Sequence, residues 1–184
     1  MSERARVGRT LVRLLRRRGG GRRGHGAAEE AVAWAQSALE AGLTNRAVCI
    51  LAAASPPYYS SEIDELFSTV LDALGLPEPE PIDALHDSSL LVICRAVLAG
   101  ELAVGQALDD IAWILEDAGW PDRHAAWIAL VEAGSLMALG EAQVFVPTLS
   151  AVSLGEHVRR AARETLSQFR EPSWLPAYLS LDFD

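Results

Sequence analysis

Few residues in this sequence have the type and spacing that catalysis or metal binding requires. The adjacent pair His86-Asp87 is the strongest candidate for a metal site. Hydrolases that use such a pair also need a separate upstream His, and here the only one is His25, in a Gly-rich stretch. Asp87 also precedes Ser88 and Ser89, where a helix could start, so a structural role explains it equally well. A metal-dependent hydrolase with a site near His86 and Asp87 is therefore kept as an alternative hypothesis.

Other catalytic patterns are missing or accidental. The stretch from Gly19 to Gly24 spells G-x-G-x-x-G, but it has no strand before it and no helix N-terminus to hold a pyrophosphate. The chain has no Lys, which excludes Walker-type phosphate loops and Schiff-base chemistry. No Glu-x-x-His and no G-x-S-x-G occurs. We expect no catalytic residue and no cofactor, and a protein that is not an enzyme.

Two groups of residues are better suited to binding a protein. The acids Asp109, Asp110, Glu116 and Asp117 span two turns of one predicted helix, and a solvated or partner-facing surface explains them better than a metal site does. The rings of Tyr58-Tyr59 follow Pro56-Pro57 on a predicted loop, where exposed rings suit a contact surface. Alternatively, one of these rings folds onto the core.

The charge distribution favours a basic partner. The net charge is -9, and all 16 basic residues are Arg, which is typical of a GC-rich, bacterial-type genome. Residues 1–26 hold nine Arg against Glu3, a net +8, whereas the remaining residues hold 7 Arg against 24 acids, a net -17. An acidic body repels phosphates, so we expect nucleic acid to bind only through the N-terminal segment, if at all.

The basic segment 1–26 is predicted to be a loosely ordered N-terminal extension. Residues 4–18 could form a short amphipathic helix, followed by a flexible Gly-rich hinge. It could bind RNA or anionic lipid, fold back on the acidic body, or be a translated upstream stretch of the gene. The candidate RNA-binding residues are Arg16, Arg17, Arg18, Arg22 and Arg23.

The remaining residues, 27–184, are predicted to form one acidic, compact, all-α domain of about seven helices. Apolar residues recur every three to four positions between Gly and Pro, which favours helices over strands. Ser61 and Ser153 each have an acid three positions on, the pattern of a helix N-terminal cap. The predicted helices are 28–41, 45–54, 61–74, 83–99, 103–118, 122–139 and one that starts at 153 and ends before Pro172.

An internal similarity raises the question of repeats. Residues 71–77 and 115–121 share the form Leu, acid, two residues, Gly, apolar, Pro, at a spacing of 44. This spacing suits stacked helical hairpins of the HEAT type. However, Gly-apolar-Pro after a helix is also the form of any well-terminated helix.

The tail and the tryptophans are interpreted as packing elements. Residues 171–184 alternate apolar and acidic side chains, and we expect this tail to dock on its own domain rather than on a partner. The tryptophans lie at helical positions or helix ends in Ala-rich sequence, where large rings fill space between helices. Cys49 and Cys94 are expected to be buried thiols.

A non-enzymatic helical interaction module with an acidic surface is the favoured hypothesis. An adaptor-like or immunity-like protein that binds a basic protein would have this charge. No apolar run is long enough for a membrane span and no signal peptide is evident, so we expect a cytoplasmic protein without stable membrane insertion.

Overall fold

The computed structural model describes residues 3–19, 26–77, 82–181 and 183. These residues form nine α-helices and one 3-10 helix, with no strand among them, which confirms the all-α prediction. All seven predicted helices of the body are found, with most ends within about two residues of the prediction. The helices are α1 (Glu3–Gly19), α2 (Ala27–Glu40), α3 (Arg46–Ala52), α4 (Ser60–Ala73), α5 (Ile82–Leu98), α6 (Val104–Asp117), η1 (Asp122–His124), α7 (Ala125–Ala138), α8 (Leu154–Gln168) and α9 (Leu175–Leu179).

The sequence similarity between residues 71–77 and 115–121 is explained by a shared way of ending a helix. After α4, Gly75 has φ +63° and the Leu76 N–H donates to the Leu71 carbonyl at 3.0 Å. After α6, Gly119 has φ +73° and the Trp120 N–H donates to the Leu115 carbonyl at 2.8 Å. This is the Schellman hydrogen-bond pattern, which needs a left-handed residue that Gly adopts without strain. The similarity therefore gives no support for HEAT-type repeats.

The chain groups into two compact units, not into the single domain that was predicted for residues 27–184. Unit 1 comprises residues 1–85 and 172–184, and unit 2 comprises residues 86–171. The predicted boundary after residue 26 does not separate them. Local periodicity predicts helices, but it does not show which helices share a core. The boundaries between the two units could therefore not be predicted from it.

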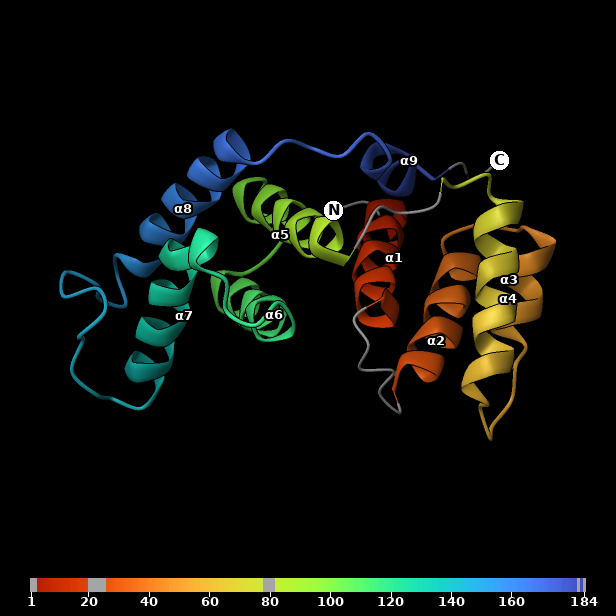
Figure 1. The fold of residues 1–184 in the computed structure, drawn as a ribbon, viewed down its shortest axis with the longest axis horizontal. Helices are drawn as coiled ribbons and strands as arrows, with labels where there is room; N and C mark the ends of the chain where they lie inside the picture. Colours follow the sequence, from red (N-terminus) through yellow and green to blue (C-terminus); the bar gives the residue numbers. More distant parts are fainter. Residues whose placement is uncertain (1–2, 20–25, 78–81, 182, 184) are drawn as a thin grey trace. The chain divides into compact units, whose positions relative to one another are not determined.

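Unit 1 is built on contacts between consecutive helices. Helix α2 packs against α1, α3 and α4, and α3 packs against α4 (Figure 1). In its core the Trp34 ring meets the Phe67 ring edge-on, with centroids 6.1 Å apart. The indole N–H of Trp34 donates to the Val7 carbonyl at 3.0 Å, so this residue joins α1 to α2 and α4.

The prediction that the N-terminal segment is loosely ordered is wrong for residues 3–19. They form helix α1, whose apolar side is buried: Val7, Leu11, Val12, Leu14 and Leu15 are at most 6% exposed. An amphipathic helix becomes stable when its apolar stripe packs on other elements, and here α2 and α9 supply them. The Gly-rich stretch at 20–25 lies outside the described residues.

The C-terminal tail packs on α1 within unit 1. Trp174, Leu175 and Tyr178 are buried, and the Tyr178 hydroxyl donates to the Pro77 carbonyl at 2.6 Å. A β-carbon placed on Gly8 would lie 2.6 Å from the Tyr178 carbonyl oxygen. The two backbones therefore approach so closely that only Gly fits at position 8.

Unit 2 contains α6, η1, α7, α8 and most of α5 around one core. Leu90 and Cys94 from α5, Ile111 from α6 and Trp127 from α7 are buried there with the apolar side of α8. The Trp127 indole donates to the Thr165 hydroxyl at 2.8 Å, which fixes α7 against α8. One side of helix α6 thus packs in the core of unit 2, and its other side faces outward.

Among the helices that the structure describes, none combines the length and the apolar character that crossing a bilayer would take.

Candidate functional site on helix α6

The apolar pattern of α6 determines which side of the helix faces outward. Its buried residues recur at helical spacing and cover one side: Ala107, Leu108, Ile111, Ile114 and Leu115. Asp109, Trp113 and Glu116 lie between these positions and are exposed on the side away from the core of unit 2. The outer side of α6 is therefore fixed by packing, and a partner could bind it without rearranging the helix.

Trp113 lies on this outer side and is 57% exposed. The sequence-based interpretation of the tryptophans as packing residues is correct for Trp34, Trp127 and Trp174, which are at most 4% exposed. It is wrong for Trp113 and for Trp120, which is 39% exposed. A signal is present in the sequence, because position 113 lies off the apolar stripe that Ile111 and Leu115 form at helical spacing. A large exposed ring is the kind of residue that dominates protein interfaces.

The four acids predicted to bind a partner surround this ring. Asp109 and Asp110 precede Trp113 by four and three residues, and Glu116 and Asp117 follow it by three and four. Residues three and four apart are neighbours on a helix surface, with β-carbons roughly 5–6 Å apart. Asp109, Glu116 and Asp117 are exposed and Asp110 is half-buried. The structure thus gathers the predicted acids around an aromatic residue that the sequence analysis had not included.

The electrostatic setting of this surface strongly favours a cation. Helix α6 carries four acids and no basic residue, and unit 2 holds 12 acids against 6 Arg, a net -6. Glu116 and Asp117 also occupy the last turn, where the helix dipole is negative and an acid costs about 0.3–1 kcal/mol. These two acids therefore reduce the stability of the helix while they strengthen its negative potential.

Trp120 adds a second exposed indole just beyond the end of α6. Its φ is +54°, a left-handed conformation that is uncommon for any residue other than Gly. It follows Gly119, which is also left-handed, and its N–H caps the helix end at Leu115. A strained backbone thus presents this ring beside the acidic last turn of α6.

The other predicted partner-binding residues, Tyr58 and Tyr59, belong to unit 1. Tyr59 is 64% exposed and immediately precedes α4, whereas Tyr58 is half-buried. Tyr59 therefore has the exposure expected of a contact residue, and Tyr58 is partly covered. The structure does not bring these tyrosines together with the α6 acids into one unit.

The metal candidates His86 and Asp87 lie in a different environment from the one a metal would need. One Asp87 oxygen is 3.0 Å from His124 Nε2 and 3.2 Å from Arg123 Nη2. Burial raises the pKa of Asp87, but the His124 hydrogen bond and the Arg123 charge outweigh it, so the pKa lies below its ordinary value. His86 is buried, and adjacent helix residues do not face each other. Within the described ranges, no three His, Cys, Asp or Glu side chains gather as metal ligands would. Asp87 instead ties η1 to α5.

Among the candidate RNA-binding arginines, the structure describes the surroundings of Arg16. Arg16 is 3% exposed, so its prediction as a phosphate contact is wrong. Arg17 and Arg18 lie in the last turn of α1, and Arg22 and Arg23 lie outside the described residues. Arg16 is covered because the apolar side of α1 packs on the rest of unit 1.

The cysteines differ from each other. Cys94 is buried in unit 2, and burial raises the pKa of its thiol to about 12. Cys49 is exposed on α3, so the prediction of a second buried thiol is wrong. Both cysteines are free.

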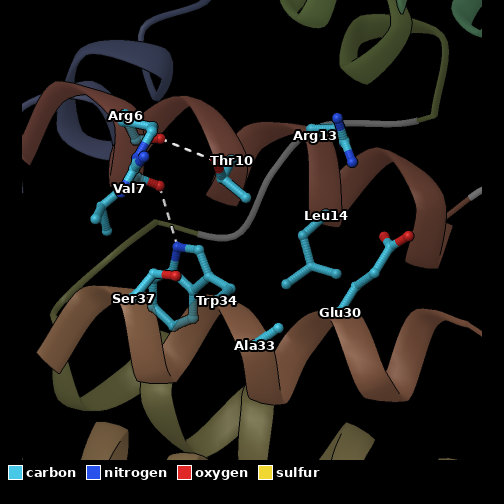
Figure 2. Close-up of a pocket in the computed structure, with 9 residues that line it drawn as sticks. All are labelled: Arg6, Val7, Thr10, Arg13, Leu14, Glu30, Ala33, Trp34 and Ser37. Atoms are coloured by element: carbon cyan, nitrogen blue, oxygen red, sulfur yellow. Dashed lines mark hydrogen bonds between the residues drawn. The ribbon is translucent and has the colours of Figure 1, made fainter. Parts of the chain in front are cut away.

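A small cavity lies between α1 and α2 (Figure 2). Its volume is about 190 Å³, below the roughly 300–1,000 Å³ of ordinary ligand sites. Figure 2 shows that Trp34 and Thr10 already donate to backbone carbonyls at 3.0 Å. Arg6 on its rim is paired with Glu3 at 2.9 Å. The cavity is a gap between two packed helices, and we assign no ligand to it.

Comparison of the chain with protein-family models, with curated proteins and with solved structures finds no match in any of the three. Function is therefore argued from the residues themselves.

Proposed function

We propose that this protein is a non-enzymatic protein–protein interaction module and that the outer side of α6 binds a basic segment of its partner. One observation carries the proposal: the exposed Trp113 ring has an acidic residue on each of the four neighbouring helix positions. An indole supplies apolar contact area, and the carboxylates supply attraction and orientation. Either element alone is common on protein surfaces, but their combination is what a basic protein would recognise.

The proposed role is that of an adaptor or of an immunity-like protein that covers a basic surface of its target. An acidic protein meets a basic target faster than a neutral one does, because the electrostatic field steers the two together. Binding by this route weakens as salt screens the charges. The metal-dependent hydrolase near His86 and Asp87 is not developed further, because Asp87 is engaged by Arg123 and His124.

The test compares two variants with the same change in net charge. In the first, the four α6 acids become amides: Asp109→Asn, Asp110→Asn, Glu116→Gln and Asp117→Asn. Helix α4 provides the control, because it also has four acids and no basic residue. The control variant carries Glu62→Gln, Asp64→Asn, Glu65→Gln and Asp72→Asn. Binding of a fluorescent oligoarginine peptide is measured by anisotropy at low and high ionic strength.

We expect the α6 variant to bind roughly tenfold more weakly, equivalent to about 1.4 kcal/mol, with little change for the α4 variant. Equal losses in both variants would mean that only total charge matters, and the proposed site would be wrong. A larger loss for the α4 variant would move the site to unit 1, where the exposed Tyr59 lies next to α4.

A further inference from the structure

We infer that the α6 surface selects arginine over lysine and that its occupant is an arginine-bearing segment of another protein. This inference rests on the proposed function and specifies its partner. The starting observation is the exposed ring of Trp113, because an indole is the best aromatic partner for a cation and pairs more often with Arg than with Lys. A guanidinium is planar and weakly hydrated, so it can lie flat on the indole, whereas an ammonium is compact and keeps its water.

The spacing of the acids matches a guanidinium stacked on Trp113. The nearest acids before and after it are Asp110 and Glu116, each one helical turn away along the surface. A guanidinium presents five N–H donors in a rigid fork, which can meet a carboxylate through two parallel hydrogen bonds while its face rests on a ring. One arginine side chain could therefore contact the ring and a flanking carboxylate together, which a lysine ammonium does less well.

The charge of the surroundings excludes the other common partners of an exposed indole. Nucleic acids and anionic lipids carry phosphates, which the net -6 of unit 2 and the four acids of α6 would repel. A purely apolar partner would remove four carboxylates from water at the contact, at a desolvation cost. An arginine-bearing segment satisfies both the ring and the acids.

The role of Trp113 can be separated from the role of charge. Oligoarginine and oligolysine of equal length and equal labelling carry the same charge, so four carboxylates alone attract both. The indole is the part of the surface that distinguishes them. Replacement by Ser, a polar residue, at this exposed position should leave the fold intact, which circular dichroism and urea denaturation verify.

The experiment titrates the full-length protein and its Trp113→Ser variant with both peptides. We expect the full-length protein to bind oligoarginine more tightly than oligolysine, and we expect Trp113→Ser to lower this ratio by about two- to fivefold. The affinity for oligolysine should change little. The charge-neutral α6 variant should bind neither peptide well.

The outcomes distinguish the inference from the function on which it rests. An unchanged arginine-to-lysine ratio in Trp113→Ser would overturn the arginine selection, while loss of binding in the neutral α6 variant would still support the proposed function. If neutralising α6 leaves the binding of both peptides unchanged, the proposed function is wrong as well. An oligonucleotide or anionic vesicle that binds to α6 in competition with oligoarginine would also overturn the inference.

Discussion

Helices α4 of unit 1 and α6 of unit 2 share their length, their number of acids and the way they end, but they differ in the placement of their aromatic residue. Each has 14 residues, four acids and no basic residue, and each ends at a left-handed Gly with a Pro two positions later. On α6 the acids surround Trp113. The α4 position with the most similar acidic neighbours is Ser68, which follows Asp64 and Glu65 by four and three residues and precedes Asp72 by four. The single aromatic residue of α4, Phe67, is 3% exposed and packs on Trp34.

This comparison shows that a high density of acidic residues does not by itself identify a binding surface. Both helices meet the sequence criterion for a solvated acidic face equally well. They differ in where the large ring points, and this depends on which positions the core of each unit covers. The feature that distinguishes α6 from α4 is the solvent-exposed ring of Trp113 among the four acids.

The largest expected difference concerns the aromatic residue of each helix. Phe67→Ala should lower the free energy of unfolding by about 3–5 kcal/mol, because it opens a cavity next to Trp34. Trp113→Ala removes a ring that is mostly in solvent and should change stability by less than about 0.5 kcal/mol. Urea denaturation of both variants measures the difference. A large loss for Trp113→Ala would mean that the ring supports the fold, and the comparison would fail.

A smaller effect distinguishes Asp87, which contacts His124 and Arg123, from the exposed Asp109 on α6. The pKa of Asp87 is lowered in the folded protein, so it stabilises the fold above its unfolded pKa near 4, and this contribution is lost as the pH falls through the lower folded value. We expect Asp87→Asn to lower stability by about 1 kcal/mol at neutral pH and to converge with the unmodified protein in acid. Asp109→Asn is the control and should have almost no effect. Unfolding free energies across the acid range would contradict this if both variants behaved alike.

Helix α4 can be given the surface of α6 by one substitution. Ser68→Trp places an indole among Asp64, Glu65 and Asp72 at an exposed position. In a Trp113→Ser background we expect it to restore the preference for arginine by about two- to fivefold, the effect of an exposed cation–π contact. The two peptides used above measure the ratio. If Ser68→Trp gives no preference, features of α6 beyond the ring and its acids are required.

The smallest effect comes from the acids in the last turns. Asp117→Arg should raise stability by about 0.5 kcal/mol, because a cation complements the negative end of the helix dipole, and it should weaken oligoarginine binding. Asp72→Arg on α4 should stabilise by a similar amount and leave binding unchanged. Thermal denaturation and peptide titration of both variants provide the measurements. A loss of stability in Asp117→Arg would show that Asp117 has a structural role.

The sequence predicts the helices well and their packing poorly. Periodic apolar residues and helix-terminating glycines determine where segments such as 104–117 are helical, since these are local properties. The burial of α1 was missed because Val7 and Leu11 become core residues only when α2 and α9 cover them, which is information from residues distant in sequence. The two capping predictions had different outcomes. Ser153 is the N-cap residue of α8, as predicted, although its hydroxyl bonds with Ser150 and not with a helix N–H. Ser61 is not a cap, because α4 already begins at Ser60.

The candidate site was predicted in part for the same reason. The acids of α6 are visible as a sequence cluster, but the exposure of Trp113 depends on which side of the helix the core of unit 2 covers. The surroundings of the metal candidate Asp87 could not be predicted either, because it contacts Arg123 and His124, more than 30 residues away in the chain. Pairings across such separations leave no local sequence pattern.

The close approach of Gly8 to Tyr178 has a consequence for biosynthesis. Unit 1 combines residues 1–85 with residues 172–184, so it cannot be completed until residues 172–184 have been synthesised, whereas residues 86–171 are contiguous and can fold before that. A nascent chain that lacks residues 172–184 leaves the surface of α1 around Gly8 without its cover. We expect chaperones to bind this intermediate more than the completed protein, because its apolar surface on α1 is exposed.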